Sequence, residues 1–279
     1  MDDVVGCDGL NANATALSMV LRMLHGDGFA QLIDYRQVIT INSLVHGMTC
    51  DGRLVVAVSP QPGDPVDEMP FAQGIDVRLD ITKESPEPDL QMIVATLHGL
   101  GVLRWAPEAT RTAMIEDNIL PPEVEMVASL PNGRLGLVEV PRLLLHDAEG
   151  VRSFDHELLR ADGMLGSPRF LQGVDQIEAF HMVQAMGTDA VHAIHRCVLT
   201  GKLTGRVRSH SAERTDCAHV WGQMYCADID ATGITWLQVL PEATTSIFVA
   251  FDKGVTTLED LTGQLDRLLL VAVVHDGVV

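Results

Sequence analysis

The segment from Ala218 to the C-terminus constrains the fold most, because short β-like runs alternate with turns and then give way to one amphipathic stretch. The runs read AHVWGQMYCADID, ATGITWLQVL and TTSIFVAFDKGV. The stretch TTLEDLTGQLDRLLLVAV repeats leucine at helical spacing, and Thr256 followed by Glu259 predicts a capping box at its start. This order of elements predicts a small α+β module.

The first half of the chain has a different pattern, in which several β-like runs follow one helix. Apolar residues recur at helical spacing over 12–25, and Gly26 and Gly28 end that helix. Asp51-Gly52 predicts a hairpin turn between two of the runs that follow. A helix over 107–120 and a strand over 133–150 come last. Short strands at close spacing predict an antiparallel barrel or sandwich.

Two of these strands carry local detail. In the run DVRLDIT, Val77, Leu79 and Ile81 alternate with polar residues, so we expect one face of that strand to be solvated. Pro141 predicts a bend in the strand over 133–150. We divide the chain into a domain over 1–150, an irregular linker over 151–172 and a second domain over 173–279.

Composition excludes several classes of protein. Apolar residues make up 47% of the chain, too many for a disordered protein, and the formal net charge of −19 disfavours nucleic acid as a partner. The acidic start and the lack of a long apolar run predict neither a secretory signal nor a membrane span. Five cysteines without a CxxC motif are typical of reduced thiols, so we expect a cytoplasmic protein without a structural metal site.

No sequence motif indicates a reaction. The chain has no GxSxG, no GxxxxGK[ST] and no HExxH. If residues 174–199 form one helix, His181, His192 and His195 make a stripe beside its apolar face. Such a stripe could ligate a metal or haem, or it could be the polar border of a packed helix.

The C-terminal module resembles the one found in haem-utilisation (HugZ-like) split-barrel proteins. The resemblance covers roughly residues 175–272 and rests on His181-Met182, the run Asp230–Ile234, the run Ile247–Phe251 and the run Val255–Leu261. In that family the module follows a flavin-binding-type split β-barrel related to pyridoxamine 5′-phosphate oxidase. The resemblance therefore implies an α+β protein: an N-terminal antiparallel split β-barrel with flanking helices, then a smaller C-terminal α+β domain.

The first function that this resemblance implies is haem binding in haem or iron utilisation, with oxidative haem degradation as a further activity. It also implies a homodimer that pairs through the barrel. A histidine would ligate the iron and an arginine would hold a propionate or phosphate group. The candidate cofactor-binding residues are His181, His46, His98, Arg53, Arg78 and Arg104.

Two alternatives stay open. The barrel could bind FMN as a flavin-dependent oxidoreductase, although residues 1–150 contain only one lysine, Lys83, and eight arginines among 22 carboxylates. The protein could instead be a cofactor-free module that binds and regulates another protein. The run Val183–Met186 favours this reading, because it replaces the Asn, Asp and His that the family places after His-Met.

Overall fold

A computed structural model describes residues 8–37, 39–87, 92–161, 164–166, 171, 174–211 and 220–276. It divides into two compact units. We call residues 19–83 with 95–168 the barrel unit, and residues 1–18, 84–94 and 169–279 the module unit. Helix α1 (Asp8–Leu24) contributes residues to both units.

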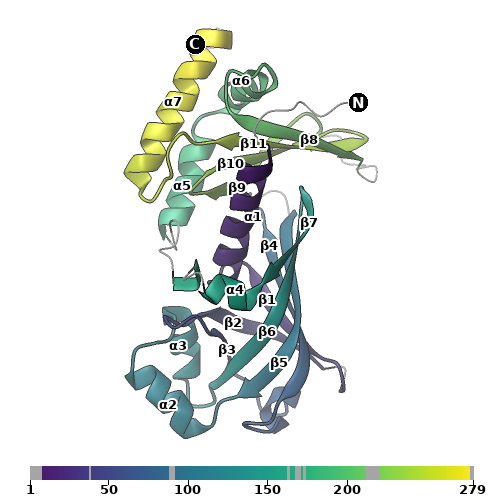
Figure 1. Ribbon diagram of the computed structural model, residues 1–279, viewed down its shortest axis with the longest axis vertical. Coiled ribbons are helices and arrows are strands. Elements are labelled where there is room, and N and C mark those ends of the chain that lie inside the picture. The colour runs from purple at the N-terminus through teal and green to yellow at the C-terminus, as the bar shows by residue number, and fades with distance from the viewer. Residues whose placement is uncertain are drawn as a thin grey trace. The chain divides into compact units, whose positions relative to one another are not determined.

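The barrel unit contains a closed barrel of six strands (Figure 1). Its strands are β1 (Phe29–Asp34), β2 (Ile39–Met48), β3 (Leu54–Val58), β4 (Ile75–Glu84), β5 (Ile93–Trp105) and β6 (Arg134–Asp147). They run in the order β3-β2-β1-β4-β5-β6, and antiparallel pairing of β3 with β6 closes the ring. The closed barrel and the second sheet confirm the predicted α+β fold. Because the ring is closed, the first of the two predicted alternatives, a barrel and not a sandwich, is the one that forms.

Alternation along the strands separates the inner face of the barrel from the outer face. On β4, Val77, Leu79 and Ile81 have no exposed surface; Arg78 between them is exposed, whereas Asp80 is buried. Leucines of β1, β5 and β6 complete the interior. Because six strands enclose little space, mostly apolar side chains fill it. The solvated face predicted for β4 is confirmed at Arg78 but not at Asp80, which is buried.

Two helices cover the outer face of β3. α2 (Glu108–Glu116) lies within the helix that the sequence predicted over 107–120, and α3 (Pro122–Ala128) is a further helix that was not predicted. Pro121-Pro122 begins the second helix, because proline is favoured at a helix start. Val55 and Ala57 of β3 pack against these helices. Parts of β5 and β6 keep an outer face that is exposed.

The segment after the barrel has regular structure up to residue 161. β7 (Gly150–Asp155) pairs with β6, and α4 (His156–Ala161) follows directly. The Asp155 carboxylate accepts a hydrogen bond from the Leu158 backbone N–H at 3.1 Å, and thereby caps α4. The irregular structure expected from residue 150 onward is therefore wrong for this part of the segment.

The module unit has a four-stranded sheet in the order β8-β11-β10-β9. Its strands are β8 (Gly205–Ser211), β9 (Met224–Asp230), β10 (Gly233–Val239) and β11 (Ala243–Ala250), with helices α5 (Val174–Gln184), α6 (Thr188–Leu199) and α7 (Leu258–Asp276). A core that includes Trp236, Ile247 and Leu261 joins sheet and helices. No helix among the described residues is long and apolar enough to cross a bilayer.

Two local predictions for the module unit are wrong. Residues 174–199 form two helices, because Gly187 adopts φ +80 between them, so the single histidine stripe does not exist. The capping box at α7 lies one residue further along than predicted. The Asp260 N–H donates to Thr257 Oγ1 at 3.1 Å, and the Asp260 carboxylate accepts from the Thr257 N–H at 3.0 Å.

Candidate functional site

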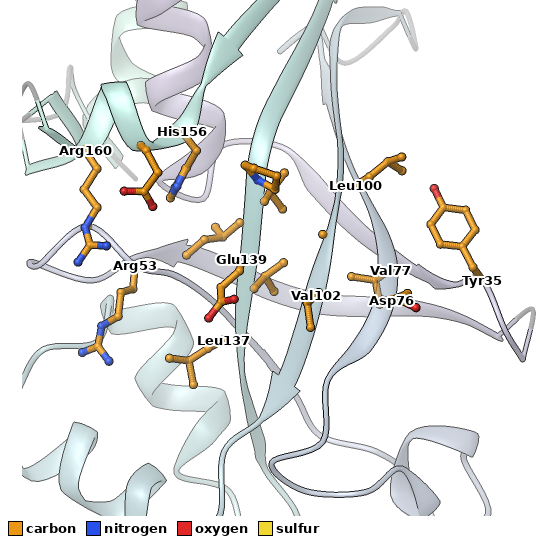
Figure 2. A pocket seen from close by; sticks show the side chains of 17 residues that line it. Tyr35, Arg53, Asp76, Val77, Leu100, Val102, Leu137, Glu139, His156 and Arg160 are labelled. Carbon is orange, nitrogen blue, oxygen red and sulfur yellow. The ribbon is translucent and has the colours of Figure 1, made fainter.

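The barrel unit carries a pocket of about 690 Å³, which we call the outer groove (Figure 2). This volume is within the roughly 300–1,000 Å³ typical of small-molecule sites. Strands β4, β5 and β6, the turns after β1 and before β3, and helix α4 supply its walls. The residues used below are Tyr35, Arg53, Leu100, Val102, Leu137, Glu139, His156, Glu157 and Arg160.

A bulge in β6 shapes the floor of the groove. The register advances two residues from Leu100 to Val102 on β5 but three residues from Arg142 to Glu139 on β6. Pro141 lies in the extra step, where its missing N–H interrupts no regular ladder. A Cβ at Gly101 would stand 2.2 Å from the Glu139 carbonyl oxygen, so only glycine fits opposite the bulge. The bend predicted at Pro141 is this bulge.

The floor itself is apolar and its rim is charged. Leu100, Val102 and Leu137 share the groove, and Leu100 is 60% exposed. Glu139 forms an ion pair with Arg104, with 2.8 Å between Glu139 Oε2 and Arg104 Nη1. Arg53 pairs with Asp51 at 2.9 Å. Of the arginines predicted for cofactor binding, Arg53 lines the groove and is already paired with a carboxylate, whereas Arg104 does not line it and pairs with the lining residue Glu139.

His156 is the functional residue that the sequence analysis missed. It is the first residue of α4, it lines the groove, and only 8% of it is exposed. Its Nε2 is buried and has no hydrogen-bond partner among the described residues. Burial lowers the pKa of His156, against the opposing charge of Glu157. The one available signal in the sequence was Asp155, a favoured residue directly before a helix.

Two other predicted residues meet on β4 and β5. Arg78 Nη2 lies 2.6 Å from Asp80 Oδ2, and His98 Nδ1 lies 2.6 Å from Asp80 Oδ1. The His98 ring also packs edge-on against His146, with 5.1 Å between ring centroids. None of these four residues lines the outer groove. A carboxylate that fixes one imidazole nitrogen is the usual support of a ligating or proton-transferring histidine.

The remaining two predicted residues lie elsewhere. His46 is buried, and its Nε2 is 2.6 Å from the Met23 carbonyl oxygen. Burial lowers the pKa of His46, while the bond to Met23 opposes this shift. His181 is an exposed residue of α5 in the module unit. The six predicted residues therefore do not form one site.

The outer groove is suited to a large, planar, partly apolar cofactor with acidic groups. Haem needs an apolar surface, partners for two propionates and one axial nitrogen. The floor provides the apolar surface, Arg53 and Arg160 line the groove, and His156 Nε2 is a nitrogen to which no described residue hydrogen-bonds. No group of three His, Cys, Asp or Glu residues in the described part of the chain could hold a separate metal ion.

Comparison with known proteins gives structural likeness only. No family model and no curated protein matches the chain. A heme binding protein from Mycobacterium smegmatis is 13% identical with a TM-score of 0.46, over 93% of this chain and 97% of that one. Campylobacter jejuni ChuZ is 7% identical, with a TM-score of 0.33 over 54% and 61% of the two chains.

The solved structures also include a flavin protein. The general stress FMN/FAD binding protein of Xanthomonas citri is 15% identical with a TM-score of 0.31, over 57% of this chain and 95% of that one. The three structures thus include one protein named for heme and one named for FMN/FAD. Since a shared fold does not carry function with it, the residues of the groove must carry the functional argument.

Proposed function

We propose that this protein binds haem in the outer groove and serves haem or iron utilisation. The observation that carries the proposal is the apolar floor of the groove next to a buried histidine, His156, whose Nε2 has no hydrogen-bond partner among the residues that the structure describes. The resemblance of the C-terminal module to haem-utilisation proteins supports the same reading. When bound, haem supplies an iron centre whose chemistry depends on its ligand and on the polarity of the pocket.

Different residues of the groove would contact different parts of the haem. Leu100, Val102 and Leu137 would cover porphyrin carbon and exclude water from it. Arg160 and Arg53 would pair with the propionate carboxylates, because the planar guanidinium group matches the geometry of a carboxylate. Glu139 stays paired with Arg104 and so does not repel these carboxylates with a free charge.

FMN is the second candidate ligand, and the charges of the groove disfavour it. A phosphate group carries more concentrated charge than a propionate, so its binding needs cations that are not already paired. Arg53 is paired with Asp51 through Nε, so Asp51 already offsets part of its charge. Arg53 and Arg160 can each meet one singly charged propionate, but they supply little surplus positive charge for a phosphate dianion.

A titration with hemin and with FMN tests the proposal. We expect saturable hemin binding with a shifted Soret band, and weaker or no FMN binding. Leu100→Glu should weaken hemin binding about 10- to 100-fold. The variant places a charge on the floor, and it removes the roughly 1.5–3 kcal/mol that burial of the leucine side chain under hemin would contribute.

The matched control is Leu144→Glu. Leu144 is 39% exposed and faces outward on β6, but it does not line the groove, so hemin affinity should stay unchanged. Absence of a Soret shift in the wild-type protein would overturn the proposed function. Equal losses in both variants would place the haem site outside the groove.

A further inference from the structure

We infer that His156 is the residue of this chain that ligates haem iron. The inference rests on the haem-binding function proposed above and goes beyond it, because it selects one nitrogen from the histidines of the chain. It also moves the assignment away from His46, His98 and His181, the histidines that the sequence suggested.

The first argument compares two buried histidines of the barrel unit. His46 is 5% exposed, and its Nε2 lies 2.6 Å from the Met23 carbonyl oxygen. His156 is 8% exposed, and its Nε2 has no partner among the described residues. A histidine that serves only packing normally satisfies its ring nitrogens, as His46 does. An unpartnered nitrogen destabilises the free protein, and a bond to a ligand would remove that cost.

The second argument is position. His156, Glu157 and Arg160 all line the groove, so one side of α4 forms part of its wall. Figure 2 shows His156 extending downward from α4, on the side of the view where the Glu139 and Leu137 side chains lie. Arg160 lies one turn along the same helix. The helix thus offers a nitrogen for iron and a cation for a propionate on one surface.

Ligation requires a small movement, because Nε2 makes no contact with water in the free protein. Helix α4 has six residues and packs on β6, β7 and η2 (Met164–Gly166). A rotation of the imidazole or a shift of this short helix is enough to turn the nitrogen into the groove.

The competing histidine is His98, which is more accessible. Its Nδ1 already bonds to Asp80, and such a carboxylate often supports a metal-ligating histidine. His98 does not line the groove, however, and its ring packs against His146. A metal bound at His98 would therefore lie beside the apolar floor and not over it.

The test compares His156→Gly, His156→Ala and His98→Ala in the full-length protein, with absorbance and electron paramagnetic resonance spectra of the ferric hemin complex. We expect both His156 variants to lose the wild-type spectrum and at least about 10- to 100-fold of hemin affinity, the loss typical of removing even an outer partner of a metal site. His98→Ala should keep the wild-type spectrum. Added imidazole should restore that spectrum in His156→Gly, which a purely structural role would not allow.

Each other outcome has a defined meaning. A wild-type spectrum in both His156 variants overturns the inference but leaves haem binding in place. Loss of the spectrum in His98→Ala alone overturns the inference and assigns the iron to His98. If a His156 variant melts far below the wild type, imidazole rescue of His156→Gly still decides the question. If hemin does not bind the wild-type protein, the proposed function fails, and the inference fails with it.

Discussion

The inner and outer faces of the barrel are built from the same strands but differ in how completely their side chains are satisfied. Inside, Val77, Leu79 and Ile81 of β4 are fully buried, and His46 bonds to a backbone carbonyl. Outside, a bulge breaks the register of β5 and β6, and His156 has a buried nitrogen without a described partner. The interior is thus organised for stability, and the irregular features gather where a ligand could bind.

This comparison assigns different consequences to substitutions that are close in sequence. A change on the inner face should reduce the free energy of unfolding and leave the affinity of the folded protein for its ligand unaltered. A change in the groove should lower the affinity for the ligand and leave the free energy of unfolding unaltered. Three measurements test or sharpen this separation.

The largest effect is expected for Leu79→Ala. Leu79 is 0% exposed inside the barrel, so its truncation leaves a cavity and should cost about 2–5 kcal/mol of unfolding free energy. Urea unfolding measures this loss. Thr82→Ala, on the same strand but only partly buried, should cost much less. Equal losses would show that the inner face does not dominate stability.

A smaller effect concerns pH. Burial lowers the pKa of His46 below its ordinary 6.5, so the folded protein holds this histidine neutral while the unfolded chain takes up a proton. Stability is therefore fully present above pH 6.5 and falls as the pH drops below it, by at most about 1.4 kcal/mol per pH unit for one proton. Unfolding of His46→Gln, followed from neutral to acidic pH, should depend less steeply on pH. An unchanged slope would contradict the role of His46.

The smallest effect is expected at the start of α4. Asp155→Ala removes the carboxylate that accepts from the Leu158 N–H, which should cost about 1 kcal/mol. Amide hydrogen exchange should show faster exchange in α4, while Ser153→Ala on β7 should change nothing. Unaltered exchange in α4 would mean that other contacts hold this helix.

Much of the barrel was predictable from local patterns. The alternation around Leu79, the hairpin at Asp51-Gly52 and the bend at Pro141 each depend on neighbouring residues. The structure confirms the hairpin, the bend and the buried side of the alternation, but Asp80 of its predicted polar side is buried. Closure by β3 and β6 was not predictable, because pairing between distant strands leaves no trace in either one. The split between α5 and α6 shows that Gly187 outweighed a continuous apolar pattern.

The candidate site was predictable only in part. Arg53 does line the groove, Arg104 pairs with the lining residue Glu139, and Arg78 and His98 meet at Asp80. His156 escaped prediction because a helix of six residues is too short to show a period. The missing partner of its Nε2 is a property of the packed structure and has no signature in the sequence.

The bulge at Pro141 also reverses which residues of β6 face outward: odd-numbered residues do so before it and even-numbered residues after it. Leu137 and Glu139 face outward on one side of it, whereas Leu143 and Leu145, of the same parity, point inward on the other side. Deleting one residue there would reverse the facing of every side chain in one half of the strand. Either Leu143 and Leu145 would then be exposed to water, or the Glu139 carboxylate would point into the interior. The length of β6 is therefore a stricter requirement than its composition: side chains in the groove can change one at a time, but the number of residues cannot.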